Sequence, residues 1–222
     1  MNYKVVDIEK YYRKSIYKHF TEDAKCSISI TSRIDVTNLK NFSKIIKRKF
    51  YINFLYVLSK ALNSREDYKM VYHWKTNKLV IYDKINPKQY IFHDDTETIT
   101  VIYTEYDENY EIFYKNAFDD LNKAKATRDY GLDTENHPNW FDASYIPFIS
   151  YDSLNIELPD GYLYFNPIIN WGSYQEENGK FLMPVTVRLN HAIADGYHVA
   201  RVYKLIEEEI TNFLNMKGLV KW

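Results

Sequence analysis

The stretch 177-ENGKFLMPVTVRLNHAIADGYHVARVYKLIEEEITNF-213 predicts a turn, a strand, a short connection and a helix in direct succession. Asn178-Gly179 is the dipeptide that tight turns favour where φ must be positive. Apolar residues then alternate with others, as in a strand with one buried face: Phe181, Met183, Val185, Val187 and Leu189. After Gly196 they recur at the spacing of one helix face: Val199, Val202, Tyr203, Ile206, Ile210 and Phe213.

The predicted connection between strand and helix contains His191 and Asp195. A histidine at the end of a buried strand can be shielded from water while its ring faces a pocket. Its unperturbed pKa is close to working pH, as a general base requires. The same spacing suits a structural histidine beside an aspartate that caps the next helix. Spacing alone leaves both interpretations open.

The rest of the chain predicts a mixture of helices and strands. Helical spacing indicates helices over 9–20, 35–49, 50–62 and 109–126, with Asp35 or Thr37 as the cap of the second. Strands are expected over 26–34 and 99–106, and as a hairpin over 70–74 and 79–82. No repeat or Gly/Ser/Pro-rich linker divides the sequence, so we expect one domain over residues 1–222.

Composition excludes several classes of protein. With 222 residues, 45% apolar and 27% charged, the chain suits one globular domain with a substantial core. A net charge of -1 gives no reason to expect nucleic acid or an anionic membrane as partner. No apolar run resembles a signal peptide or approaches membrane-spanning length. The single cysteine, Cys26, excludes an intramolecular disulfide framework, and we therefore expect a cytoplasmic protein.

The histidines outside the connection show no metal-ligand spacing, and the chain has no cysteine pair. It also has no glycine-rich phosphate loop. We therefore predict no metal and no nucleotide hydrolysis.

The segment 190-NHAIADGYHVAR-201 resembles the catalytic signature of the type A chloramphenicol acetyltransferases, usually HHAVCDGFHVAR. Other stretches resemble the same family in the same order, so that the resemblance covers nearly the whole chain. They are Val6-Asp7-Ile8 before Tyr12-Arg13-Lys14, Ile34-Asp35-Val36-Thr37, Phe50-Tyr51, Phe92-His93 before Thr96-Glu97-Thr98, Glu135-Asn136-His137 and Asn166-Pro167-Ile168-Ile169.

The resemblance implies a two-layer α/β sandwich in which helices cover a mixed β-sheet, the fold of the CoA-dependent acyltransferases. It also implies a homotrimer with active sites at the subunit interfaces. Each such site takes its histidine from one subunit and much of its acceptor pocket from the neighbour. Acetyl-coenzyme A, the co-substrate, enters from the opposite end of the same tunnel.

Carried over by position, His191 matches the family's general base and Ser144 matches the serine that stabilises the oxyanion of the tetrahedral intermediate. Asp195 matches a structural aspartate that pairs with an arginine, for which Arg13 is the counterpart. The alternative for Ser144 is an ordinary turn serine, because the segment 138–142 is longer than in the family and the alignment around 136–145 can slip.

The departures from the family concentrate at the acceptor. The first signature histidine is Asn190 here, and the cysteine before the aspartate is Ala194. The positions that match acceptor-pocket residues are Phe20 for a tyrosine, Cys26 for a cysteine, Ile99 for a phenylalanine, Phe148 for a tryptophan and Asn170 for a threonine that holds a transition-state water. For Cys26, a small buried residue is the alternative role.

The resemblance therefore implies an enzyme, an acetyl-CoA-dependent O-acetyltransferase that acetylates chloramphenicol and confers resistance to it. Two alternatives remain at this point. One is acetyl transfer to another hydroxylated small molecule, because the acceptor pocket is altered. The other is a non-catalytic binding protein on the same fold, which would have no need of the base His191.

Overall fold

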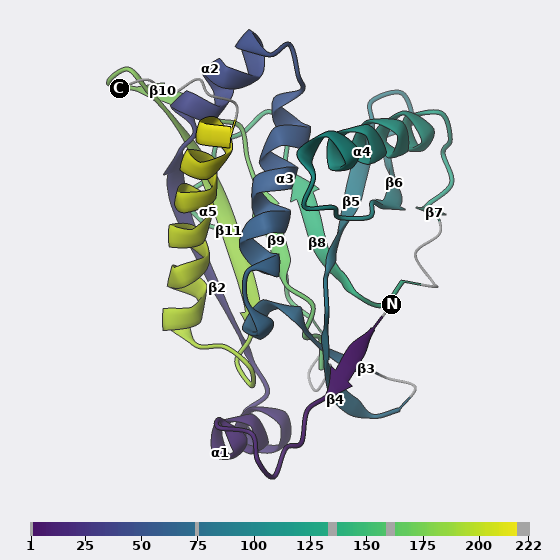
Figure 1. Cartoon of the computed structure of the whole chain (residues 1–222), viewed down its shortest axis with the longest axis vertical. Helices are drawn as coiled ribbons and strands as arrows, with labels where there is room; N and C mark the ends of the chain where they lie inside the picture. Colours follow the sequence, from purple (N-terminus) through teal and green to yellow (C-terminus); the bar gives the residue numbers. More distant parts are fainter. Residues whose placement is uncertain (1, 74–75, 133–136, 159–162, 217–222) are drawn as a thin grey trace.

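Four long helices cover one face of a mixed β-sheet in the computed structural model, which describes residues 2–73, 76–132, 137–158 and 163–216 (Figure 1). They are α2 (Thr37–Ile45), α3 (Phe50–Asn63), α4 (Tyr110–Lys125) and α5 (Gly196–Met216). A short helix α1 (Lys14–Lys18) continues into one π-helical turn, His19–Asp23, below the sheet in this view. The two-layer α/β arrangement expected from the sequence is confirmed.

The main sheet places strand β11 beside the long edge strand β2 and joins parallel and antiparallel pairs. Its order is β2-β11-β9-β8-β5-β6-β7, with β10 forming a hairpin with the start of β11. The strands are β2 (Ser27–Asp35), β5 (Asn86–His93), β6 (Thr98–Tyr103), β7 (Gly131–Leu132), β8 (Trp140–Tyr145), β9 (Ile168–Trp171), β10 (Gln175–Glu177) and β11 (Lys180–Asn190). A smaller sheet combines β1 (Tyr3–Val5), β4 (Lys78–Tyr82) and β3 (Met70–His73).

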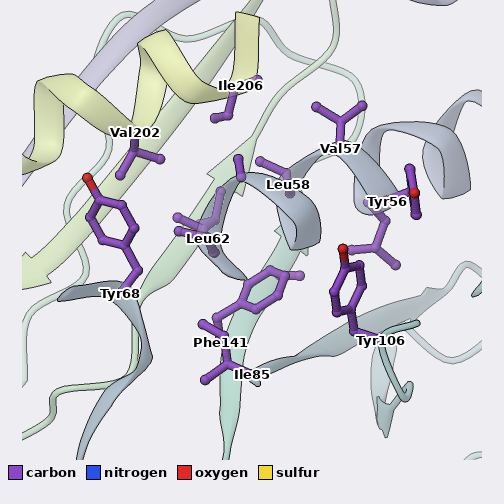
Figure 2. Packing of buried hydrophobic residues seen from close by; sticks show 14 of the residues in the cluster. Tyr56, Val57, Leu58, Leu62, Tyr68, Ile85, Tyr106, Phe141, Val202 and Ile206 are labelled. Carbon is purple, nitrogen blue, oxygen red and sulfur yellow. The ribbon is translucent and has the colours of Figure 1, made fainter. Parts of the chain in front are cut away.

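Helix α3 is the centre of the core. Leu58 and Leu62 are fully buried between α5 and the sheet, and Figure 2 shows Val202 of α5 and Phe141 of β8 among their neighbours. The polar Asn53 is also fully buried in this helix. It donates to Ser43 Oγ at 2.8 Å and accepts from the Tyr110 hydroxyl at 2.7 Å, so its burial leaves no unmet hydrogen bond there.

The alternation of β11 separates the two faces of the sheet. Val185, Val187 and Leu189 are buried in the core under the helices, whereas Thr186 lies on the opposite face. The pairing places Thr186 opposite Asn170 of β9, and Asn170 opposite Ser144 of β8. Residues directly opposite one another share a face, so a row of polar side chains crosses the helix-free face.

Several expected elements are confirmed closely: the strand and helix of the opening stretch, helices 50–62 and 109–126, and the hairpin, of which residue 74 lies outside the described residues. Asn109 caps α4, its side chain accepting the backbone N–H groups of Glu111 and Ile112.

Three boundaries were wrong. The helix expected over 9–20 begins only at Lys14, and the strand over 99–106 ends at Tyr103. The helix over 35–49 ends at Ile45, because the chain takes a positive φ of 53° at Lys47. The prediction of a single domain over 1–222 stays a prediction.

Candidate active site

His191 lies in the five-residue connection between β11 and α5, where the sequence placed it. The main chain is held firmly there: the His191 N–H donates to the Cys26 carbonyl at 3.0 Å, and the Asn190 side chain accepts the Ala192 N–H at 2.9 Å. Asn190 thus fixes the turn that aims the neighbouring ring.

Phe20 stacks on the His191 imidazole, with 3.8 Å between ring centroids and 9° between planes. It is carried by the π-helical turn His19–Asp23, a conformation often found at functional sites. The His191 Nδ1 atom is buried and has no hydrogen-bond partner within the described part of the chain. The residue as a whole is half-buried.

Asp195 connects Arg13 to the start of α5. Arg13, only 6% exposed, donates from Nη1 to Asp195 Oδ2 at 2.9 Å. The other carboxylate oxygen accepts the Tyr197 N–H at 3.0 Å and pairs with His198 Nδ1 at 2.8 Å. The aspartate therefore caps the helix and also pairs with Arg13, the arginine that the resemblance assigned to it.

These contacts determine the charge state of Asp195. Burial alone would raise the pKa of its carboxyl, but the hydrogen bonds from His198 and Arg13 outweigh burial and hold the pKa well below its usual range. Asp195 is accordingly ionised at neutral pH and stabilises the turn that follows His191.

We expect Asp195→Asn to lower the free energy of unfolding by about 1–2 kcal/mol at neutral pH. A fully buried pair loses about 3–5 kcal/mol, and the 38% exposure of this side chain reduces the effect. Since the folded pKa is depressed, the contribution is complete above about pH 5 and is lost as the pH falls through about 4 and below. The melting-temperature difference should therefore shrink in acid. Asp119→Asn, in an exposed pair with Lys115, is the control.

Arg13→Met tests the other side of the same pair. If neither this variant nor Asp195→Asn changes the melting temperature at neutral pH, the pair has no structural role.

Ser144 and Asn170 lie in a second place, a cavity of about 560 Å³ on the helix-free face of the sheet. The chain segment that follows β8 contributes Ile156, Leu158 and Tyr164 to its wall. Ser144 is half-buried and Asn170 is buried, and both belong to the lining of this open cavity. The full lining is Lys88, Tyr90, Asp142, Ser144, Ile156, Leu158, Tyr164, Ile168 and Asn170.

A charged cluster forms one wall of this cavity. Lys88 Nζ lies 3.1 Å from Asp142 Oδ1, which also accepts the Tyr90 hydroxyl at 2.7 Å. The other carboxylate oxygen accepts the Tyr164 hydroxyl. Burial, reinforced by the Asp142 charge, raises the pKa of Tyr90 and of Tyr164, so both hydroxyls stay protonated and donate.

Within one chain, His191 lies far from the cavity that contains Ser144 and Asn170. Thr186 lies opposite Asn170, and His191 follows Thr186 by five positions, directly after the end of β11. At about 3.4 Å per residue, that separation is about 17 Å. In Figure 1, β11 runs down towards α1, whereas β8 runs the opposite way. Within a single chain, His191 and Ser144 therefore do not meet in one cavity.

The remaining acceptor candidates are divided in the same way. Cys26 belongs with His191, because its carbonyl accepts the His191 N–H. Cys26 is exposed, so the expectation of a small buried residue is wrong for the single chain. Ile99 is 36% exposed and Phe148 is 84% exposed, and neither lines the cavity with Ser144. Of the family-like stretch Glu135-Asn136-His137, the first two residues lie outside the described residues.

A second cavity, of about 440 Å³, lies at the carboxyl ends of β8 and β9. Tyr145 and Trp171, which directly follow Ser144 and Asn170, line it together with Phe50, Tyr51, Gly172, Ser173, Tyr174 and Met183. Gly172 is required at this wall, because a Cβ there would lie 2.7 Å from the Ile149 carbonyl oxygen. The cavity thus offers flat aromatic surface next to the strand ends that carry Ser144 and Asn170.

The sequence interpretation missed Lys88, Tyr90, Asp142 and Tyr164. One signal could have found two of them: each lies as a charged residue within a short strand, Lys88 in β5 and Asp142 in β8. Neither strand was predicted, because Pro87 interrupts the first pattern and the second lies within the segment 136–145, where the alignment can slip.

Across the described ranges, no three His, Cys, Asp or Glu side chains come together as a potential metal site. Among the described helices, none has the length and apolar character required to cross a bilayer.

Comparison with known proteins gives a consistent result over almost the full length. The family model described as chloramphenicol acetyltransferase matches residues 1–207. The chloramphenicol acetyltransferase of Clostridium perfringens is 30% identical over 218 residues, covering 98% of this chain and 99% of that protein. Chloramphenicol acetyltransferase 3 of Escherichia coli is 30% identical over 211 residues, 94% of this chain and 97% of that one.

Solved structures agree on the fold. A chloramphenicol acetyltransferase superposes with a TM-score of 0.85 at 21% identity, covering 94% of this chain and 100% of the other. The dihydrolipoamide acetyltransferase of Azotobacter vinelandii gives a TM-score of 0.64 at 13% identity, covering 86% and 84%. At these identities, the superpositions show a shared architecture.

Proposed function

Because this chain belongs to the chloramphenicol acetyltransferase family, we propose that it transfers the acetyl group of acetyl-coenzyme A to a hydroxyl group of chloramphenicol. The observation that carries the proposal is the near-full-length similarity together with a half-buried, stacked His191 at the strand-to-helix connection. Acetylation of the antibiotic would give resistance to the host.

In the proposed reaction, His191 acts as the general base. Its Nε2 accepts the proton of the acceptor hydroxyl while that oxygen attacks the thioester carbonyl carbon. When the C–S bond breaks, the coenzyme A thiolate leaves and takes the proton from the imidazolium, giving the acetyl ester and free coenzyme A. The stacking of Phe20 supports this role, because it fixes the plane of the ring.

Ser144 is the proposed oxyanion donor. Its hydroxyl faces the cavity beside Asn170, and a donor aimed at a developing oxyanion contributes about 10²–10³ in rate. Asn170 occupies the position of the family's water-holding threonine, and its buried amide can donate or accept a hydrogen bond there.

We propose a homotrimer in which His191 of one subunit faces the Ser144 cavity of the next. The separation of about 17 Å within one chain supports this assembly, because a complete site then requires a second copy. Phe148 supports it as well, since so exposed an aromatic side chain gains apolar contact when a neighbour covers it.

Acetyl-coenzyme A is the proposed co-substrate, and no metal takes part in the proposed chemistry. The cavity lined by Tyr145 and Trp171 supports a coenzyme site, because flat rings suit its adenine and the cavity adjoins the strand end of Ser144. We also propose a cytoplasmic location, which the exposed free thiol of Cys26 supports.

Thiol release from acetyl-coenzyme A, with and without chloramphenicol, tests the proposal. We expect release that depends on chloramphenicol and yields its acetyl ester. Release with another alcohol but none with chloramphenicol would instead identify a different hydroxylated acceptor. Saturable binding of chloramphenicol, without release from acetyl-coenzyme A under any of these conditions, would identify a non-catalytic binding protein.

A further inference from the structure

An ion pair forms part of the wall of the proposed acceptor cavity. Among the described residues that line this cavity, Lys88 and Asp142 are the two that carry a charge at neutral pH. Their side chains are 15% and 6% exposed, so both are largely removed from water. The remaining lining includes the apolar side chains of Ile156, Leu158 and Ile168.

Stability alone does not account for a pair in this position. The cost of desolvating two charges commonly cancels their attraction, and well-packed apolar residues often replace such pairs without loss. A pair at the wall of a ligand cavity can instead be used in recognition, where charges discriminate between ligands.

The cluster of Lys88, Tyr90, Asp142 and Tyr164 has more hydrogen-bond donors than free acceptors. Asp142 accepts hydrogen bonds from the Tyr90 and Tyr164 hydroxyls and forms an ion pair with Lys88, so that three groups share its two oxygens. The Lys88 ammonium has three N–H groups and, in the described structure, Asp142 as its ion-pair partner. Its other near neighbours are ring faces, Trp140 at 4.3 Å and Tyr90 at 5.7 Å. Two ammonium hydrogens thus remain to bind an oxygen in the cavity.

Arg188 adds positive charge beside the cavity. It stands opposite Ile168, on the same face of the sheet and in the same row as Lys88 and Asp142. Burial lowers the pKa of its guanidinium, with Tyr164 and Asp142 opposing that effect only in part. The row therefore contains two cations, Lys88 and Arg188, and one carboxylate, Asp142. The resulting electrostatic potential in the cavity favours an anion.

We propose that Lys88 determines specificity by binding an anionic or strongly electron-rich oxygen group of the acceptor, at a distance from its reacting hydroxyl. This rests on the proposed acetyl transfer. Lys88 lies opposite Asp142, and Ser144 is two residues further along the same strand as Asp142. The recognised group is therefore on the order of 7 Å from the reacting oxygen. The selected class is alcohols that carry a carboxylate or a similar group at that distance.

Two probes that differ in charge but not in shape test this assignment. One is chloramphenicol, and the other is its analogue with a carboxylate in place of the aromatic nitro group, which has the same planar outline. The quantity to measure is the ratio of kcat/KM for the analogue to that for chloramphenicol. It is compared between the wild type and K88M/D142N, which removes the two charges of the Lys88–Asp142 pair together, so that neither of them is left without the other.

We expect the ratio to fall at least about tenfold in K88M/D142N, as expected when a charge-assisted hydrogen bond is lost. The KM for acetyl-coenzyme A should stay within about twofold, which a general structural defect would not allow. The control K84M/E105Q removes an exposed lysine–carboxylate pair at 2.8 Å outside the cavity and should leave the ratio unchanged. K88R, which keeps the positive charge, should retain the preference for the carboxylate.

A ratio that changes less than threefold in K88M/D142N overturns the assignment, as does an equal loss with both probes. If the wild type releases no thiol with either probe, acetyl transfer fails separately, and the same comparison is made on dissociation constants. Trp140, beside Lys88, is a suitable fluorescent reporter for those measurements, with Trp140→Phe as its control. Dissociation constants whose ratio is the same in wild type and K88M/D142N would also overturn the assignment.

Discussion

Replacement of His191 by alanine is expected to lower turnover by about 10²–10⁴, the usual contribution of a general base. The half-buried ring contacts Phe20 at 3.8 Å but makes no hydrogen bond through Nδ1 in the described structure. Its removal therefore costs stacking contact and little polar structure, and the variant should fold. Steady-state thiol release, with circular dichroism to verify the fold, measures both quantities.

His73→Ala is a suitable control, since His73 lies in the small sheet and stacks on Tyr3. Turnover of the His191→Ala variant within a few-fold of wild type would remove His191 from the mechanism.

Mixing two inactive variants is expected to restore activity. His191→Ala lacks the proposed base, and Ser144→Ala lacks the proposed oxyanion donor, so each alone should lose at least about 10² in rate. In a closed ring of randomly mixed chains, about a quarter of the interfaces unite an intact His191 with an intact Ser144 from the neighbour. Co-expression in equal amounts should therefore restore about a quarter of wild-type activity.

The separation of the two residues within one chain makes this outcome diagnostic. If both residues acted within the same chain, every site in the mixture would carry one defect, and the mixture would be as inactive as its components. Sedimentation of the mixed protein verifies the assembly, and a mass near that of a single 26.7 kDa chain in active enzyme would contradict the trimer.

The helices and strands that the sequence predicted best are those with one face buried in the core and the other face outside it. The alternation over 181–189 and the helical spacing after Gly196 correspond to β11 and α5, each with one face in the core. α3 was predictable because it is apolar over most of its surface and lies in the centre of the helical layer.

Strands β5, β8 and β9 were missed because both of their faces contact other residues. Phe141 and Ala143 of β8 are buried under the helices, while Asp142 is buried in the cavity on the other face. With both faces buried, alternation between apolar and polar residues disappears, and periodicity cannot separate such a strand from other buried segments.

The site was predictable only in part for a related reason. A short motif placed His191 and Asp195 together, and a family position added Arg13; in the structure Arg13 pairs with Asp195 in the connection that also contains His191. The walls of the cavity come from four separate segments, and only the pairing of strands reveals that Lys88 and Asp142 are neighbours.

Gly172 connects the wall of the aromatic cavity to the wall of the acceptor cavity. Its α-carbon leaves no room for a side chain beside the Ile149 carbonyl, and the next residue, Ser173, donates its N–H to that same oxygen at 2.7 Å. Ile149 belongs to the segment that continues to Ile156 and Leu158 in the acceptor cavity, while Gly172 belongs to the wall of the aromatic cavity. A ligand that displaces either wall therefore moves a backbone shared with the other.

Such a shared backbone has a thermodynamic consequence. If occupation of the aromatic cavity changes the affinity of the acceptor cavity by some factor, the acceptor must change the affinity of the aromatic cavity by the same factor. We therefore expect the dissociation constant of each substrate to depend on the presence of the other. A bulkier residue in place of Gly172 would disturb both affinities, although it touches only one cavity.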